Sequence, residues 1–338
     1  MKTLNLLCVG LFMAICGVSS ATIINVNNDT PSPGEYDDLQ NAIDAAMPGD
    51  TLYLAPTLLN YGNIVLSKQL AIIGPGYNVT GGLLGAHAVL NDIDIDDAAA
   101  GGSAIIGIRF NELSSGLSTN AISGMQVRRC IIDYRIYTSN DVWSDGIFEG
   151  NVFTDAGNVM TSTTGNGFFT CIIQNNIFNG LIYYADNCQI SNNLFLGTSA
   201  GSTALLGGCD NTVFSNNIVI GRNVGSAGPT NNFFANISFD GSLNIFPNGT
   251  NFEGVDPMFT NAGVGLFSFT NDYELDAGSP GIGNGIGGDD IGVYGGDGVY
   301  RKDGEPAIPI IRSANVPGGN TVPANSTFNV NIISEAHE

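Results

Sequence analysis

A short recurring stretch decides the fold of this chain, and it is plainest in Ile173-Gln174-Asn175-Asn176-Ile177 and Ile190-Ser191-Asn192-Asn193-Leu194. In each five-residue copy, the first and the fifth residues are apolar. Periods near twenty residues, with one short strand per unit, are typical of solenoids whose units bury their apolar faces by stacking. Along the chain, the fourth positions are Cys130, Asn151, Asn176, Asn193, Asn217 and Asn236, at steps of 21, 25, 17, 24 and 19 residues.

The period predicts an all-β protein, specifically a right-handed parallel β-helix with an N-terminal capping helix. At a turn between strands, Asn tolerates backbone outside the β region, and its amide both donates and accepts hydrogen bonds. Coils stack at about 4.8 Å. We therefore expect a buried, hydrogen-bonded ladder that begins at Cys130, with the apolar residues on both sides of it pointing into the core. Its asparagines are Asn151, Asn176, Asn193, Asn217 and Asn236.

Residues 39–56 are predicted to close one end of the solenoid. Leu39, Ala42 and Ile43 share one face of a short helix that ends near Pro48-Gly49, and residues 51–54 form the next strand. This segment resembles the N-terminal cap of the pectin-lyase-like superfamily of right-handed parallel β-helix proteins, and residues 255–294 resemble the closing coils of its bacterial secreted members. The resemblance covers about residues 36–300. It implies the fold but no single activity, because this scaffold carries lyases, hydrolases, esterases and proteins without a known reaction.

The ends of the chain suggest export. Residues 1–21 have the positive start, apolar middle and small final residues of a cleaved signal peptide, and a lipoprotein anchored through Cys16 is the weaker alternative. Residues 22–304 are assigned to the β-helix domain, and residues 305–338, which contain several prolines, to an extended C-terminal tail. The protein is expected to be secreted or to lie at the cell surface, with no membrane span in the mature chain.

The charge balance excludes some partners. The chain has 31 Asp and Glu residues against 10 Lys and Arg, a formal net charge of −21. Binding to nucleic acid is not expected, because no basic surface exists to displace counterions. Polyuronates would also be repelled unless arginines or calcium intervene.

The best candidate site is a pair of charged residues. Arg128 and Glu149 occupy one outward column, a coil apart, so their side chains are expected to meet. An Arg beside a carboxylate suits uronate elimination, and a pair of carboxylates suits glycoside hydrolysis. The alternative is an ion pair worth at most about 1 kcal/mol. Neighbouring candidates are Arg129, Arg135, Asp133, Asp145 and Asp155, with Trp143, Tyr183 and Tyr184 as surfaces for sugar stacking.

No catalytic residue set of the superfamily can be carried over to this chain. Gly288-Asp289-Asp290 copies one polygalacturonase fragment but lies in the closing segment, and Val142-Trp143-Ser144-Asp145 only partly matches pectate lyases. No cofactor is required by any motif. Calcium is the open alternative at residues 92–97, where carboxylates alternate with Ile93 and Ile95, although the Gly and Glu of an EF-hand are missing.

Two cysteines are predicted to stack in adjacent coils, five residues before the ladder. Cys171 and Cys188 are interpreted as small buried side chains, with a disulfide as the alternative. Taken together, the sequence predicts a glycan- or surface-binding protein without an identifiable catalytic set. The alternative function is that of a lyase or glycoside hydrolase acting on an extracellular polysaccharide.

Overall fold

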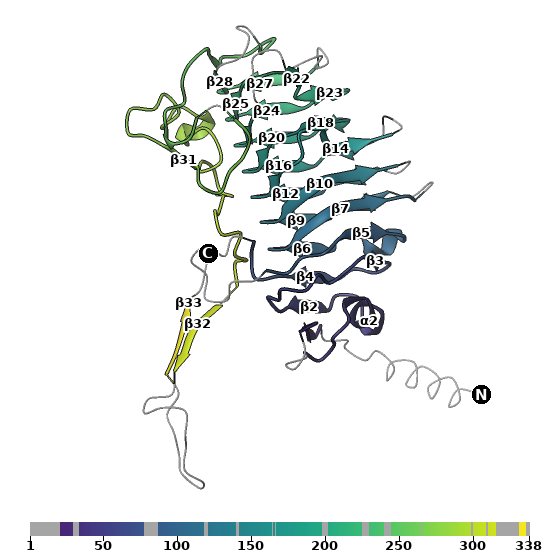
Figure 1. Cartoon of the computed structure of the whole chain (residues 1–338). Coiled ribbons are helices and arrows are strands. Elements are labelled where there is room, and N and C mark those ends of the chain that lie inside the picture. Colours follow the sequence, from purple (N-terminus) through teal and green to yellow (C-terminus); the bar gives the residue numbers. More distant parts are fainter. Residues whose placement is uncertain are drawn as a thin grey trace, which may run out of the picture.

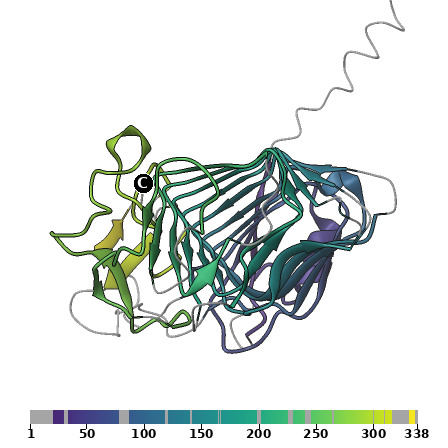
Figure 2. The same cartoon turned by 90° about the horizontal axis from the view of Figure 1, so that it is seen from above.

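The computed structural model describes residues 21–29, 34–77, 87–117, 121–139, 142–163, 165, 167–197, 202–224, 230–239, 245–263, 265–298, 300–308, 310–315 and 331–335. The predicted signal peptide, Ala21 apart, lies outside these residues. The described chain is a parallel β-solenoid that contains one α-helix (Figure 1). Seen along its axis, successive coils lie over one another (Figure 2).

Three parallel sheets form the coils. Sheet 1 has ten strands: β1 (Ile23–Val26), β2 (Thr51–Leu54), β4 (Ala71–Ile73), β6 (Ala104–Ile106), β9 (Gln126–Arg128), β12 (Ile147–Glu149), β16 (Ile172–Gln174), β20 (Gln189–Ser191), β24 (Val213–Ser215) and β27 (Asn232–Phe234). Sheet 3 has four strands: β8 (Ile122–Ser123), β11 (Trp143–Ser144), β15 (Phe168–Phe169) and β19 (Ala185–Asp186).

Sheet 2 forms the longest wall. Its thirteen strands are β3 (Ile64–Leu66), β5 (Asp92–Ile95), β7 (Arg109–Ser115), β10 (Ile131–Thr138), β13 (Val152–Phe153), β14 (Asn158–Ser162), β17 (Ile177–Phe178), β18 (Leu181–Tyr183), β21 (Leu194–Phe195), β23 (Leu206–Gly207), β25 (Ile218–Ile220), β28 (Ile237–Phe239) and β29 (Phe252–Glu253). Outside the three sheets lie β22 (Ser202–Ala204), β26 (Arg222–Asn223), β30 (Phe259–Asn261), β31 (Asp272–Leu275), β32 (Ile310–Asn315), β33 (Asn331–Glu335) and the short 3-10 helices η1 (Ala98–Ala100) and η2 (Ile286–Gly288).

The predicted N-terminal helix and the strand after it are both present. Helix α2 (Leu39–Ala45) begins where the Asp38 carboxylate accepts a hydrogen bond from the Asn41 backbone at 2.8 Å. Its buried residues are Leu39, Ala42 and Ile43, which is the predicted face. The helix contacts β1 and β3 and lies at the N-terminal end of the solenoid (Figure 1).

The interior is built from columns of like residues. Because adjacent strands pair in register, Phe153, Phe178 and Phe195 lie over one another. Their rings are nearly parallel, with centroids 4.6 Å apart for the first pair and 4.9 Å for the second. Such contacts add to the burial of apolar area that holds one coil on the next.

The asparagines at the fourth position form a ladder inside the turn between sheets 1 and 2. All five are fully buried. A representative step joins Asn176 to Asn193, whose Oδ1 accepts hydrogen bonds from the backbone N of Asn176 at 2.9 Å and from its Nδ2 at 3.0 Å. The ladder begins at the Cys130 backbone N, which donates to Asn151, and it reaches one coil further than predicted, to Asn251.

The expectation that apolar residues on both sides of the ladder face the core is wrong for one side. The residues directly after the ladder positions form a second apolar cluster, separate from the main core. The reason is that the Asn side chain itself turns inward, so strand alternation sends the next residue outward. These residues are Ile131, Val152, Ile177, Leu194, Ile218 and Ile237.

Residues 255–294 are not closing coils, which corrects the expectation drawn from the resemblance. After β29 the chain leaves the three sheets through the antiparallel pair β30–β31. Residues 279–298 and 300–308, together named the strap here, then run back along the flank of the solenoid (Figures 1 and 2). Ile291, Val293 and Tyr300 from the strap belong to the second apolar cluster and are buried with it.

The outward asparagines of the Asn-Asn pairs hold the strap in place. Asn175 donates from Nδ2 to the carbonyls of Val293 at 3.0 Å and Gly295 at 2.7 Å. One coil further on, Asn192 Nδ2 donates to the carbonyls of Asp290 and Gly292. Each Asn-Asn pair thus has two roles, one residue in the ladder and the other binding the strap.

The C-terminal tail contributes two strands that pair with each other. Strands β32 and β33 form an antiparallel ladder from Ile310 to Glu335. The residues between these strands and the last three residues of the chain lie outside the described ranges.

Candidate ligand-binding groove

The predicted Arg128–Glu149 pair does meet. Arg128 in β9 and Glu149 in β12 are register partners in sheet 1, and their side chains form an ion pair with Nη1 and Oε1 3.3 Å apart. Gln174 in the next strand donates from Nε2 to the other carboxylate oxygen of Glu149 at 2.9 Å. Three successive coils therefore contribute to one polar row on the outer face of sheet 1.

The end of the strap lies beside this pair. Arg129 donates from Nη1 to the Glu305 carbonyl at 2.8 Å, and Pro306, like Arg128 and Glu149, lines a cavity of about 350 Å³. Only 13% of the Glu149 side chain is exposed. Burial lowers the pKa of the Arg129 guanidinium, with Arg301 adding to the effect. Among the lining residues of this cavity Glu149 is the single carboxylate, whereas glycoside hydrolysis normally uses two.

The other arginine of the predicted cluster belongs to a different wall. Arg135 in β10 pairs with Glu112, its Nε lying 2.7 Å from Oε2, and its guanidinium lies over the rings of Tyr134 and Tyr137. Asp133 is bound by Arg109, with Nε and Oδ2 2.7 Å apart. The sequence grouped these residues by their spacing, but the coil carries them from sheet 1 to sheet 2.

The predicted aromatic surfaces are largely internal. Trp143 is 1% exposed and packs against Phe148 and Phe168, so it cannot stack on a sugar. Tyr183 and Tyr184 are half-buried and pack edge to face on each other. The exposed ring on sheet 1 is instead that of Phe234, and this residue is 40% exposed. Phe234 is the register partner of Ser215.

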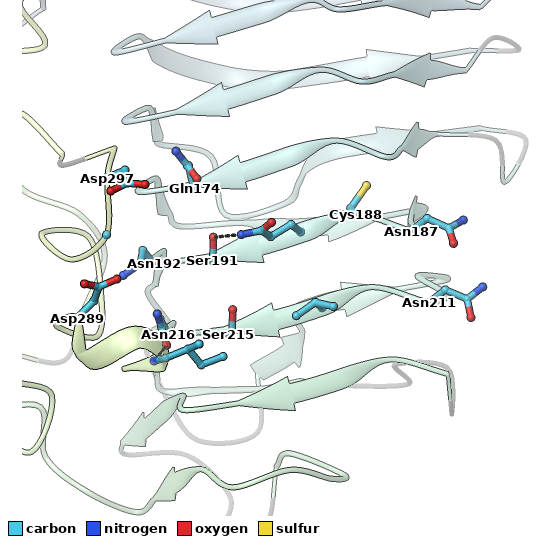
Figure 3. Close-up of a pocket in the computed structure, with 14 residues that line it drawn as sticks. Gln174, Asn187, Cys188, Ser191, Asn192, Asn211, Ser215, Asn216, Asp289 and Asp297 are labelled. Carbon is cyan, nitrogen blue, oxygen red and sulfur yellow. Dashed lines mark hydrogen bonds between the residues drawn. The ribbon is translucent and has the colours of Figure 1, made fainter. Parts of the chain in front are cut away.

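A larger groove continues the same row of residues. Its volume is about 580 Å³, and its floor is the outer face of β16, β20 and β24. Gln174, Ser191 and Ser215 lie in register there, one per coil (Figure 3). Gln189 and Val213 lie in the adjacent column. The sequence predicts the outward column of Arg128 and Glu149, which this row continues, but it does not predict the groove, because one wall comes from the strap.

The two walls of the groove differ in kind. On one side lie Asn187 and Asn211, which adopt the left-handed backbone conformation at a turn. On the other side the strap contributes Ile286, Asp289 and Asp297 (Figure 3). Both strap carboxylates are exposed and have no side-chain partner among the described residues, and the groove lining contains no Lys or Arg.

The cysteines beside the groove are free thiols. Cys171 and Cys188 lie in adjacent coils as predicted, both buried, and the Cys171 backbone N donates to Cys188 Sγ at 3.3 Å. A hydrogen bond with Cys171, together with burial, raises the pKa of the Cys188 thiol far above its usual range. In the next coils Thr212 and Asn231 continue this column, since the Cys188 backbone N donates to Thr212 Oγ1 and the Thr212 backbone N donates to Asn231 Oδ1.

The acidic segment at residues 92–97 consists of strand β5 and the two residues that lead into η1, with Asp97 as its N-cap. Ile93 and Ile95 are buried as predicted, while Asp92 accepts a hydrogen bond from Asn111 and Asp94 accepts one from Ser114. Within the described ranges, no three His, Cys, Asp or Glu residues are grouped so that they could hold a metal ion. Calcium binding by this segment stays a prediction.

Comparison with known proteins adds no family. No protein-family model matches the chain, and no curated protein matches it. In the part of the chain that the structure covers, no helix is both long enough and apolar enough to cross a membrane.

Proposed function

We propose that this protein is secreted or held at the cell surface and binds a polysaccharide or another surface glycan in the groove between sheet 1 and the strap. The observation that carries this proposal is the floor of the groove, where three coils hold Gln174, Ser191 and Ser215 in register. The two serines are recessed in the floor, and Gln189 and Val213 beside them are exposed. Since coils repeat about every 4.8 Å, a polymer lying along the axis meets similar groups in succession.

The chemistry of the groove suits sugars. Amides and hydroxyls both donate and accept, as sugar hydroxyls do, and the groove has the exposed amides of Asn187, Gln189 and Asn211 in addition to the row on its floor. Val213, Ile286 and the neighbouring ring of Phe234 offer apolar surface to the C–H faces of a sugar. Concave sites with apolar surface and a few convergent polar groups are typical of ligand binding.

Export and superfamily membership belong to the same proposal. The signal-like residues 1–21 support secretion, and the net charge of −21 suits a protein that remains soluble outside the cell. The coils of parallel strands, with a short helix at the N-terminal end, support a right-handed β-helix of the pectin-lyase-like type. An experimentally determined structure with left-handed coils would contradict that assignment.

The alternative function is catalysis at Arg128 and Glu149. It is favoured by their ion pair and by the adjoining cavity of about 350 Å³. We expect no turnover when the mature protein is incubated with acidic and neutral polysaccharides, with and without calcium, while unsaturated products and reducing ends are followed. Turnover that disappears in Arg128→Ala and in Glu149→Ala would replace the binding proposal with this one.

Binding itself is tested by titrating oligosaccharides of several classes into the mature protein by calorimetry. Gln174→Ala combined with Gln189→Ala is expected to weaken binding about thirty-fold, since each of the two lost hydrogen bonds is worth about 1 kcal/mol. Asn111→Ala is the matched control, because it removes an exposed amide from sheet 2, away from the groove. Equal weakening by the control, or no binding to any oligosaccharide, would contradict the proposal.

A further inference from the structure

Resting on that proposed function, we propose that the glycan bound in the groove carries free amino groups, as polymers of unacetylated hexosamines do. The inference depends on the charges that face the groove and on how they are held. Asp289 and Asp297 supply two carboxylates from the strap, and no lining residue supplies a positive charge. A ligand with ammonium groups neutralises them, whereas a uronate adds to their repulsion.

The two carboxylates differ from the third acid on the same face. Glu149 is neutralised by Arg128 and accepts a further hydrogen bond from Gln174. Asp289 and Asp297 are exposed and have neither an ion pair nor a side-chain hydrogen bond within the described part of the chain. Their full charge is therefore available to a ligand, and that of Glu149 is not.

The strap holds both carboxylates in defined places. Asp289 lies between two anchors, since Ile286 N donates to Asn216 Oδ1 at 2.8 Å and Asn192 Nδ2 donates to the Asp290 carbonyl at 3.1 Å. Asp297 follows the carbonyl of Gly295, which accepts from Asn175. Because these anchors come from successive coils, a polymer that follows the axis passes one carboxylate and then the other (Figure 3). Groups held in this way lose little conformational entropy on binding.

Long-range attraction acts in the same direction. The formal net charge of −21 gives the whole molecule a negative potential, which raises the local concentration of a cationic polymer and lowers that of an anionic one. This contribution is screened by salt, so affinity for an amino glycan is expected to fall as ionic strength rises. Contacts of the sugar rings with Phe234 and Val213 are not screened.

The test compares three glycans of equal length by calorimetry on the mature protein: a glucosamine hexamer, an N-acetylglucosamine hexamer and a galacturonate hexamer. We expect the glucosamine hexamer to bind most tightly and the galacturonate hexamer not to bind. The preference for the free amine should shrink when salt is raised from about 0.01 M to about 0.15 M, since the screening length falls from about 30 Å to about 8 Å.

Two variants locate the effect. Asp289→Asn and Asp297→Asn should each weaken the glucosamine hexamer about two- to five-fold, the range of an exposed ion pair, and leave the acetylated hexamer unchanged. Glu274→Gln is the matched control. It removes the same charge from an exposed position of β31 that does not line the groove.

The outcomes separate the two proposals. If the acetylated and free hexamers bind equally, and the Asp variants behave like Glu274→Gln, the groove binds glycans but the assignment of an amino glycan is wrong. If the galacturonate hexamer binds best, the charge argument is overturned. If none of the three binds, and neutral glucans also fail, the proposed function is lost together with this inference.

Discussion

The two asparagines of each Asn-Asn pair perform different tasks, although they are chemically identical. Asn192 takes a left-handed backbone conformation with a φ of 55°, which turns the chain so that Asn193 points inward and its own side chain points outward. Asn tolerates this conformation better than most residues. A ladder residue is paired on every polar atom, whereas an outward residue is bound only where the strap reaches it.

Removal of one ladder amide should therefore be costly. Asn193→Ala deprives the buried Asn176 backbone N and one hydrogen of its Nδ2 of their acceptor, and it removes the Asn193 Nδ2 donor from the carbonyl of Ile173. Unpaired buried polar groups cost about 1–3 kcal/mol each, so we expect a loss of about 3 kcal/mol in the free energy of unfolding, measured by urea denaturation.

Gln189→Ala is the control for this change. It removes an exposed amide from the outer face of the same coil, and a shift below about 0.5 kcal/mol is expected. Equal losses for the two variants would mean that the ladder bonds add nothing to stability beyond those of a surface amide.

The strap is the element that connects fold to function. It covers the second apolar cluster, binds Arg129 midway along sheet 1 and forms one wall of the groove. Its close contact depends on glycine at one point. Gly292 has a φ of 98°, and a Cβ added there would lie 2.6 Å from Cδ1 of Ile218.

Gly292→Ala should loosen the strap. The added methyl group meets a buried side chain in a backbone conformation that disfavours it, and a loss of about 2–4 kcal/mol in the free energy of unfolding is expected. Limited proteolysis should cut the strap faster than in the parent protein, before the coils are digested.

Gly288→Ala separates the cost of the close contact from the cost of the backbone conformation. Gly288 has a similar φ of 86°, but no heavy atom lies within 4 Å of an added Cβ. Only the backbone cost of about 1 kcal/mol should remain. If both variants resist proteolysis as the parent does, close packing of Gly292 is not what holds the strap.

At the scale of the whole molecule, two buried thiols predict how the free energy of unfolding responds to alkaline pH. Burial raises the pKa of the Cys130 thiol to about 12 and that of the Cys209 thiol to about 11, from an ordinary value near 9. Above pH 9 the unfolded chain loses these protons while the folded chain keeps them. Stability is therefore complete below about pH 9 and falls as the pH rises toward 12.

The slope can be measured. Each of the two thiols should contribute up to about 1.4 kcal/mol per pH unit in this range, which urea unfolding at a series of pH values detects. Cys130→Ala should lower stability at neutral pH but show a shallower decline. A midpoint that stays constant from about pH 8 to about pH 11 would contradict the prediction.

Much of the solenoid can be read from the sequence, because its stability is local and repetitive. Each coil repeats the same few requirements, an inward apolar residue, a turn and an Asn, so the pattern survives variable insertions. The positions of Asn176 and Asn193, the meeting of Arg128 with Glu149 and the stacking of Cys171 on Cys188 all follow from period and register alone.

The sequence by itself determined the parallel coils, the ladder and the helix at the N-terminal end, since each depends on residues close in the chain or one period apart. Only the tertiary structure decided where the strap lies, which apolar residues face outward and where the groove runs. Asn192 and Asp290 are separated by 98 residues, and no periodic rule relates them. The strap binds through backbone carbonyls, which every residue type offers, and its path therefore leaves little trace in the sequence.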